Sequence, residues 1–120
     1  MFLALLAGAL STSSALAEDV PMVSVKRLSM DMAAKVAQGA IDACREKGIQ
    51  IGVTLVDRDG TVQVAMRDTI AAPITVPISK MKAFTAVNFN AATSALGSRA
   101  DTPIGRIDGL VMSAGGIPIQ

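Results

Sequence analysis

Residues 49–67, IQIGVTLVDRDGTVQVAMR, contain two stretches of alternating apolar residues separated by a turn. Within 49–57 the apolar residues Ile49, Ile51, Val53 and Leu55 alternate, and within 61–67 Val62, Val64 and Met66 do so again. A period of two indicates β-strands with one face in a core. Between the two stretches, the pair Asp59-Gly60 favours a tight turn. The segment therefore predicts a β-hairpin, around which the other elements are assigned.

The segment before the hairpin has the pattern of an amphipathic helix. Ser29 suits the N-cap position, and Lys47 followed by Gly48 is typical of a helix end. Between them, apolar residues fall on one face and charged residues on the other. Because the apolar face consists largely of alanine, we expect it to pack closely against a sheet.

After the hairpin, the sequence predicts a loop, two helical stretches and a further strand. A helix is expected to begin near Pro77, since proline is tolerated in a first turn, and to run through Lys82 to Phe89. The remaining predictions are a loop over 68–77, a short helix or helical turn over 90–99, turns over 100–109, a buried strand over 110–114 and a turn over 115–119.

Composition excludes several classes of function. The chain has 120 residues, the length of one domain, and its 51% apolar content is too high for a disordered chain. Its 11 basic and 10 acidic residues nearly balance, which argues against nucleic-acid binding. Histidine is absent, so no Ser-His or Cys-His nucleophile pair exists, and a single cysteine cannot form an intrachain disulfide. Catalysis by the chain's own side chains is therefore not expected.

The N-terminal residues 1–17 have the pattern of a secretory signal peptide. An apolar run is followed by small polar residues and by Ala15-Leu16-Ala17, which fits a cleavage site. The alternative, a membrane anchor or buried helix, is less suitable because the segment is short and contains serine and threonine in its second half. No basic residue precedes the run, which departs from the usual pattern. We expect a periplasmic or secreted protein, with one mature domain over 18–120 and no membrane span after cleavage.

Four segments in this order carry a resemblance to a known family. They are LSMDMAAKVAQGAID over 28–42, VTLVDRDGTVQVAMRD over 53–68, KAFTAVNFNAATSAL over 82–96 and DGLVMSAGGIPI over 108–119. Together they resemble the HbpS/GlcG-like family, also called haem-degrading-domain or PduO C-terminal-like proteins. The resemblance runs from about Leu28 to Gln120.

The resemblance implies an α/β domain of the α+β type that assembles into homo-oligomers. Its antiparallel sheet would have about five strands, with helices mainly on one face. Family members continue with another strand and a helix, which this sequence lacks. Either the sequence is a fragment, or an oligomer partner covers the open sheet edge. Exported members are associated with haem, and others occur beside enzymes of small-acid or diol metabolism.

The chain departs from the family pattern at three positions. Some iron- or haem-linked members carry paired acidic residues just before the KA-x-TA helix, and a threonine where the strand before the paired glycines begins. The corresponding residues here are Pro77, Lys80 and Leu110. The resemblance therefore transfers neither a carboxylate site nor a threonine ligand to this chain.

Five residues are the candidate ligand-binding positions. Lys82, Thr85 and Phe89 fall on one face of the second helix and would pair with a propionate, donate a hydrogen bond and stack on a porphyrin. The alternative is a subunit interface or a solvated face. Gly115 and Gly116 would let the backbone approach the ligand, or would serve a tight turn.

Other residues with suitable chemistry have simpler interpretations. Without histidine, haem iron needs a ligand such as methionine or cysteine, but Met66, Met81, Met112 and Cys44 lie in apolar patterns typical of a core. The aspartates of the segment 57–59 suggest cation binding, but acidic residues are common turn formers. No metal site is predicted.

The sequence thus favours an exported, non-enzymatic protein that binds a small hydrophobic or planar ligand, with haem as the cofactor. The second helix and the glycine turn would line the site at a subunit surface. Two alternatives stay open: an accessory or enzyme-like subunit in small organic acid metabolism, and a structural oligomer-forming domain without a ligand.

Overall fold

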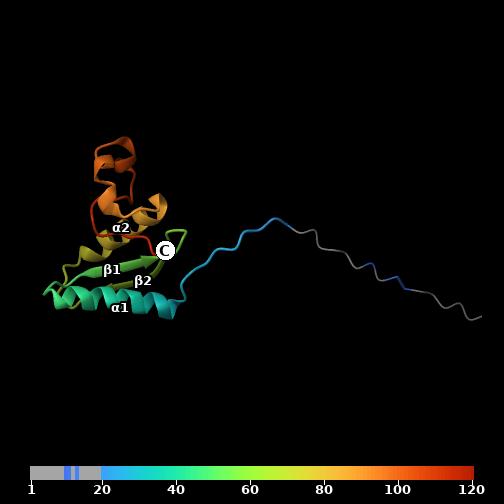
Figure 1. Cartoon of the computed structure of the whole chain (residues 1–120), viewed down its shortest axis with the longest axis horizontal. Helices are drawn as coiled ribbons and strands as arrows, with labels where there is room; N and C mark the ends of the chain where they lie inside the picture. The colour runs from blue at the N-terminus through green and yellow to red at the C-terminus, as the bar shows by residue number, and fades with distance from the viewer. Residues whose placement is uncertain (1–9, 12, 14–19) are drawn as a thin grey trace, which may run out of the picture.

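The predicted hairpin lies at the centre of the structure, a computed structural model that describes residues 10, 11, 13 and 20–120 (Figure 1). Strand β1, Gly52–Val56, pairs antiparallel with β2, Val62–Arg67. A register shift between Leu55 and Val56 marks an irregularity where the turn begins. The hairpin prediction is confirmed, although β1 begins at Gly52 rather than at residue 49.

Helix α1, Met30–Glu46, covers one face of the hairpin (Figure 1). It begins as predicted, because Ser29 caps it by accepting a hydrogen bond from the backbone N–H of Met32 at 3.3 Å. Its two innermost alanines, Ala33 and Ala37, are 0% exposed and pack against Leu55 of β1. The small side chains let the helix approach the sheet closely, as the alanine-rich face predicts.

Helix α2, Thr75–Phe89, lies on the opposite face of the hairpin (Figure 1). There the Thr54 and Ser79 hydroxyls are hydrogen-bonded at 2.7 Å. The helix begins two residues before Pro77, which still falls in the first turn, where a missing N–H costs no helical bond. Since Leu55 faces α1 and the neighbouring Thr54 faces α2, the expectation of helices mainly on one face is wrong. Successive side chains of β1 point to opposite faces, and both faces are covered.

The C-terminal third contains three short 3₁₀ helices and no strand among the described residues. They are η1, Thr93–Ala95, η2, Gly97–Arg99, and η3, Pro103–Arg106. The prediction of a strand over 110–114 is wrong. Its backbone is hydrogen-bonded to a side chain of α2 and not to a neighbouring strand. The N–H of Val111 donates to the Thr85 hydroxyl at 2.9 Å.

The sheet described by the structure therefore has two strands, in an α+β arrangement with a helix on each face. The predicted signal peptide falls almost wholly on residues outside the described ones. Among the helices of the described residues, none has the length and apolar character that crossing a membrane requires.

Candidate functional site

A cleft of about 370 Å³ opens beside α2 and contains two of the five candidate residues, Lys82 and Gly115. Residues from both helices and from β1 contribute to its surface. The cleft is lined by Cys44, Ile51, Gly52, Ile74, Thr75, Ile78, Ser79, Lys82 and Gly115. Three isoleucines make the surface mainly apolar, and Lys82 is the charged group among these residues.

Lys82 and Gly115 are in direct contact at the mouth of this cleft. The Lys82 ammonium donates to the carbonyl of Ala114 at 2.8 Å, which leaves two of its three protons for another acceptor. Gly115 has φ of 127°, and a Cβ there would lie 3.2 Å from both Cδ and Nζ of Lys82. Glycine is thus needed for the turn to pass beneath the lysine. We call this group of residues the Lys82 cleft.

Thr85 and Gly116 hold the C-terminal segment in place instead of facing the cleft. Thr85 is 0% exposed, and its hydroxyl donates to the Met81 carbonyl at 2.7 Å while accepting from Val111. The Gly116 N–H donates to the Thr93 hydroxyl at 2.9 Å, and the Thr93 N–H donates to the Gly116 carbonyl at 2.9 Å. Both residues therefore position the turn that brings Gly115 to Lys82.

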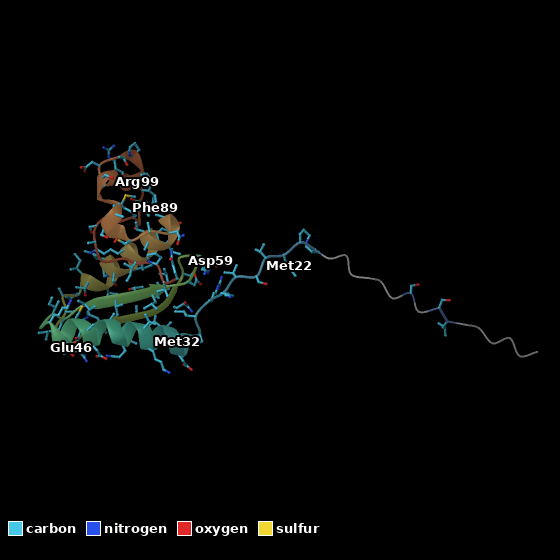
Figure 2. The ribbon with its side chains drawn as sticks, in the orientation of Figure 1. Met22, Met32, Glu46, Asp59, Phe89 and Arg99 are labelled. Carbon is cyan, nitrogen blue, oxygen red and sulfur yellow. The ribbon has the colours of Figure 1, made fainter. Side chains whose placement is uncertain are left out.

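Phe89 lies apart from the Lys82 cleft, at the end of α2. Its ring is 5.7 Å from the Arg99 guanidinium carbon, within the range of a cation–π contact. Figure 2 shows both side chains near the lobe of 3₁₀ helices, beyond the hairpin. The helical spacing placed Phe89 on the same face as Lys82, but the C-terminal segment turns back over the earlier part of that face.

The methionines and Cys44 differ in their surroundings. Met66 packs against the core between the hairpin and α1, and Met112 is buried, in agreement with the prediction of core packing. Cys44 is only half-buried and lines the Lys82 cleft, although the sequence predicted a buried thiol.

An ion pair between the half-exposed Arg45 and the buried Asp68 was not predicted from the sequence. Arg45 donates to both carboxylate oxygens of Asp68, Nε and Nη2 each at 2.8 Å, and the Asp68 side chain is 2% exposed. Hydrogen bonding from Arg45, helped by the N–H of Thr69, holds the pKa of Asp68 below its usual value against the opposing effect of burial. The same contact raises the pKa of Arg45. The pair fixes the last turn of α1 to the loop after β2.

A second cavity, of about 460 Å³, lies at the turn end of β1. It is partly basic, with Lys26, Arg27 and Arg58 among its lining residues. Arg27 is bonded to Asp59 and lies 3.4 Å from Asp57. The Asp57 carboxylate also accepts the N–H groups of Asp59 and Thr61 at 2.9 and 3.0 Å. These aspartates are turn formers, as predicted.

Comparison with known proteins places the chain in a family. Residues 28–120 match the model described as "Haem degrading protein HbpS-like". The chain belongs to the HbpS-like family. This confirms the resemblance and its extent along the sequence. Among curated proteins, no match is found.

Solved structures of HbpS superpose well on this HbpS-like chain. The crystal structure of HbpS has a TM-score of 0.77 at 34% identity, over 82% of this chain and 72% of that chain. A Streptomyces reticuli HbpS double mutant, with two glutamates changed to aspartate, has a TM-score of 0.77 at 31% identity, over 94% and 77% of the two chains. A PduOC–haem complex has a TM-score of 0.67 at 23% identity, over 73% and 69%, a likeness in fold alone.

Proposed function

We propose that this HbpS-like protein binds haem and that the Lys82 cleft holds it. Membership of a family described as haem-degrading carries the proposal, and the chemistry of the cleft supports it. A porphyrin combines a planar apolar ring with two carboxylates. The cleft offers an apolar surface with one lysine at its mouth, which matches both parts.

The residues of the cleft fit haem in three ways. Ile51, Ile74 and Ile78 provide an apolar surface for the ring. The two free protons of the Lys82 ammonium suit a propionate. Cys44, which lines the same cleft, is a sulfur donor of a type that ligates haem iron. Bound haem would supply a redox-active iron, and the protein would supply enclosure and charge.

The residues of the cleft fit binding of a ligand better than its chemical conversion. The chain has no histidine, and no carboxylate is among the residues that line the cleft. The Thr75 and Ser79 hydroxyls donate to the backbone carbonyls of Ala72 and Val76, at 2.6 and 2.8 Å. No side chain lining the cleft is therefore a ready general base.

The wider proposal concerns location and assembly. Residues 1–17 support export to the periplasm or beyond, because they have the pattern of a cleavable signal peptide. A homo-oligomer with a sheet of about five strands is the arrangement that the family resemblance implies. Mass spectrometry of the protein recovered from its native host tests cleavage after Ala17.

Titration of haemin into the purified protein, followed by the Soret band, tests ligand binding. We expect a saturable shift at one haem per chain. Lys82→Met keeps the aliphatic stem and removes the charge, so it should weaken binding about tenfold, the loss of one charge-assisted hydrogen bond at a half-exposed site. Lys80→Met, on the exposed side of α2, is the matched control and should bind as the wild type does.

Phe89 provides a further test of location. If haem occupies the Lys82 cleft, Phe89→Ala leaves its affinity unchanged, because the ring lies outside the cleft. Weaker binding in Phe89→Ala would instead support a ligand lying along α2. Unsaturable adsorption, equal in all variants, would contradict haem binding altogether.

A small organic acid is the second candidate ligand. The modest volume of the cleft and its single lysine favour it, whereas the isoleucines do not. Saturable binding of a dicarboxylate that depends on Lys82, together with no Soret shift, would select this function.

A further inference from the structure

The turn over 111–116 is held at both ends by buried threonines. At its start, the Thr85 hydroxyl accepts the N–H of Val111 at 2.9 Å. At its end, the Thr93 hydroxyl accepts the N–H of Gly116 at 2.9 Å. Both threonines are 0% exposed, and no larger side chain of the described residues is fully buried. The turn therefore has a fixed start and a fixed end.

Thr93 makes the more extensive of these two attachments. Its backbone N–H donates to the Gly116 carbonyl at 2.9 Å, and its hydroxyl both accepts the Gly116 N–H and donates to the same carbonyl, the latter at 3.3 Å. The N–H and the hydroxyl of Thr93 are thus both bonded to one residue. Because these groups are buried, water does not readily replace a bond that is lost.

The attached end of the turn lies directly against Lys82. A Cβ at Gly116 would overlap the Lys82 carbonyl oxygen, so the turn has no room to come closer to α2. One residue earlier, Gly115 lies against the Lys82 side chain, and before it the Ala114 carbonyl accepts from the ammonium at 2.8 Å. The place at which Thr93 holds Gly116 therefore sets the position of the Ala114 carbonyl, and with it that of the ammonium.

A lysine that is held in advance is better suited to receive a ligand than a free one. A lysine side chain has many rotamers, and ordering it on binding lowers affinity. The Ala114 carbonyl orders Lys82 before any ligand arrives and leaves two of its protons for an acceptor. The geometry of the ammonium, as well as its charge, therefore contributes to binding in the Lys82 cleft.

We propose that Thr93 is a positioning residue, which holds the Lys82 ammonium at the mouth of the cleft in the geometry that receives an anionic group. Thr93 is not among the residues that line the cleft, and it acts through the turn. The identity of that group as a haem propionate rests on the proposed function. The positioning itself does not, and it can be measured without a ligand.

Acetylation of lysines in the ligand-free protein tests the positioning directly. Thr93→Val keeps the shape of the side chain and removes the hydroxyl, so the turn is loosened and Lys82 loses its carbonyl partner. Peptide mass spectrometry should show Lys82 acetylated about threefold faster or more, the equivalent of one weakened hydrogen bond, with Lys80 unchanged. Thr93→Ser retains the hydroxyl and should behave as the wild type. Thr102→Val is the matched control, since that hydroxyl bonds to the Arg99 carbonyl, away from the turn.

A double-mutant cycle separates positioning from a general loss of structure. In haemin titrations, Thr93→Val should weaken binding about three- to tenfold, and no more than Lys82→Met does. In the Lys82→Met background, Thr93→Val should change the haemin affinity no further, because the residue through which Thr93 acts is absent. Equal losses in both backgrounds would overturn the proposal, since Thr93 would then act on the fold as a whole.

The same coupling can be measured without changing a buried residue. Coupling between two sites is reciprocal, so removal of the Lys82 hydrogen bond should loosen the turn that Thr93 holds. In Lys82→Met, the Gly116 amide should exchange its hydrogen about threefold faster or more than in the wild type. Lys80→Met is the control and should leave this exchange unchanged. This measurement decides the proposal even if Thr93→Val does not fold.

The failure of this proposal and that of haem binding give different results. An unchanged acetylation rate of Lys82 in folded Thr93→Val, or an unchanged exchange rate of Gly116 in Lys82→Met, would show that Thr93 does not position the ammonium. A wild type that binds no haemin would contradict the proposed function instead. The acetylation and exchange rates would then still support or overturn the role of Thr93.

Discussion

The two faces of the hairpin are built from different chemistry. Toward α1 the contacts are apolar, between the alanines of the helix and Leu55, with Val53, Val64 and Met66 around them. Toward α2 polar and apolar contacts are mixed: Thr54 is hydrogen-bonded to Ser79, Gly52 lies against Thr75, and the Phe84 ring lies beside Gly60 in the turn. Both cavities lie beside α2. We therefore expect the largest loss of stability from substitutions on the α1 face, whereas the two cavities lie on the α2 face.

The largest expected effect comes from removing a side chain on the α1 face. Leu55→Ala should lower the free energy of unfolding by about 2–5 kcal/mol, because it deletes buried methyl groups and leaves a void against two alanines that cannot fill it. Denaturant unfolding measures the change. Val36→Ala, on the exposed side of α1, should cost about 0.5 kcal/mol or less. A Leu55→Ala loss no larger than this control would mean that the α1 face is not the main source of stability.

On the α2 face, the corresponding test adds a Cβ atom at Gly52, where β1 contacts α2. A Cβ at Gly52 would lie 2.6 Å from the Thr75 hydroxyl oxygen and 2.8 Å from its carbonyl carbon. Gly52→Ala should therefore force α2 away from the sheet and cost about 1–3 kcal/mol.

Gly39 provides the matched control for this substitution. Nothing lies within 4 Å of a Cβ at Gly39, in the middle of α1. Gly39→Ala should stabilise the protein by up to about 1 kcal/mol, since alanine favours the helix. If both substitutions changed the free energy of unfolding in the same direction, the result would contradict the close approach of α2 to Gly52.

A smaller effect should appear as a pH dependence of stability at the Arg45–Asp68 ion pair. The pKa of Asp68 is lowered in the folded state, so its stabilising contribution is present above the unfolded value, about pH 4, and is lost as pH falls through the folded pKa. Asp68→Asn should lower the Tm by several degrees at pH 7, and the difference should shrink below about pH 4. Thermal unfolding between pH 2 and 7 measures it, with Asp101→Asn as the exposed control. A difference independent of pH would mean that the carboxylate charge contributes nothing.

Local patterns in the sequence predicted most of the elements. The alternation over 49–67 and the Asp59-Gly60 turn gave the hairpin, and Ser29 marked the start of α1, because strand periodicity and helix capping depend on neighbouring residues. The segment 110–114 had an equally local apolar pattern, yet it is not a strand. A strand also needs a partner, and the Thr85 hydroxyl takes the N–H of Val111 instead.

The candidate site was predicted in part. Lys82 and Gly115 lie together, as the sequence suggested, while Phe89 lies elsewhere and Thr85 is buried. Helical spacing tells which residues share a face, but it does not tell which part of that face a later segment covers. The Arg45–Asp68 pair was not predicted because no local sequence pattern connects residues on α1 with a loop beyond the hairpin.

The sequence by itself determined the family, the hairpin, both main helices and the absence of histidine chemistry. Each depends on residue identity or on spacing within a few turns of chain. Only the tertiary structure decided that the helices lie on opposite faces and that Cys44 lines a cleft with Lys82. These depend on contacts between residues distant in the sequence, whose geometry is set by how closely alanine, glycine and threonine let the elements pack.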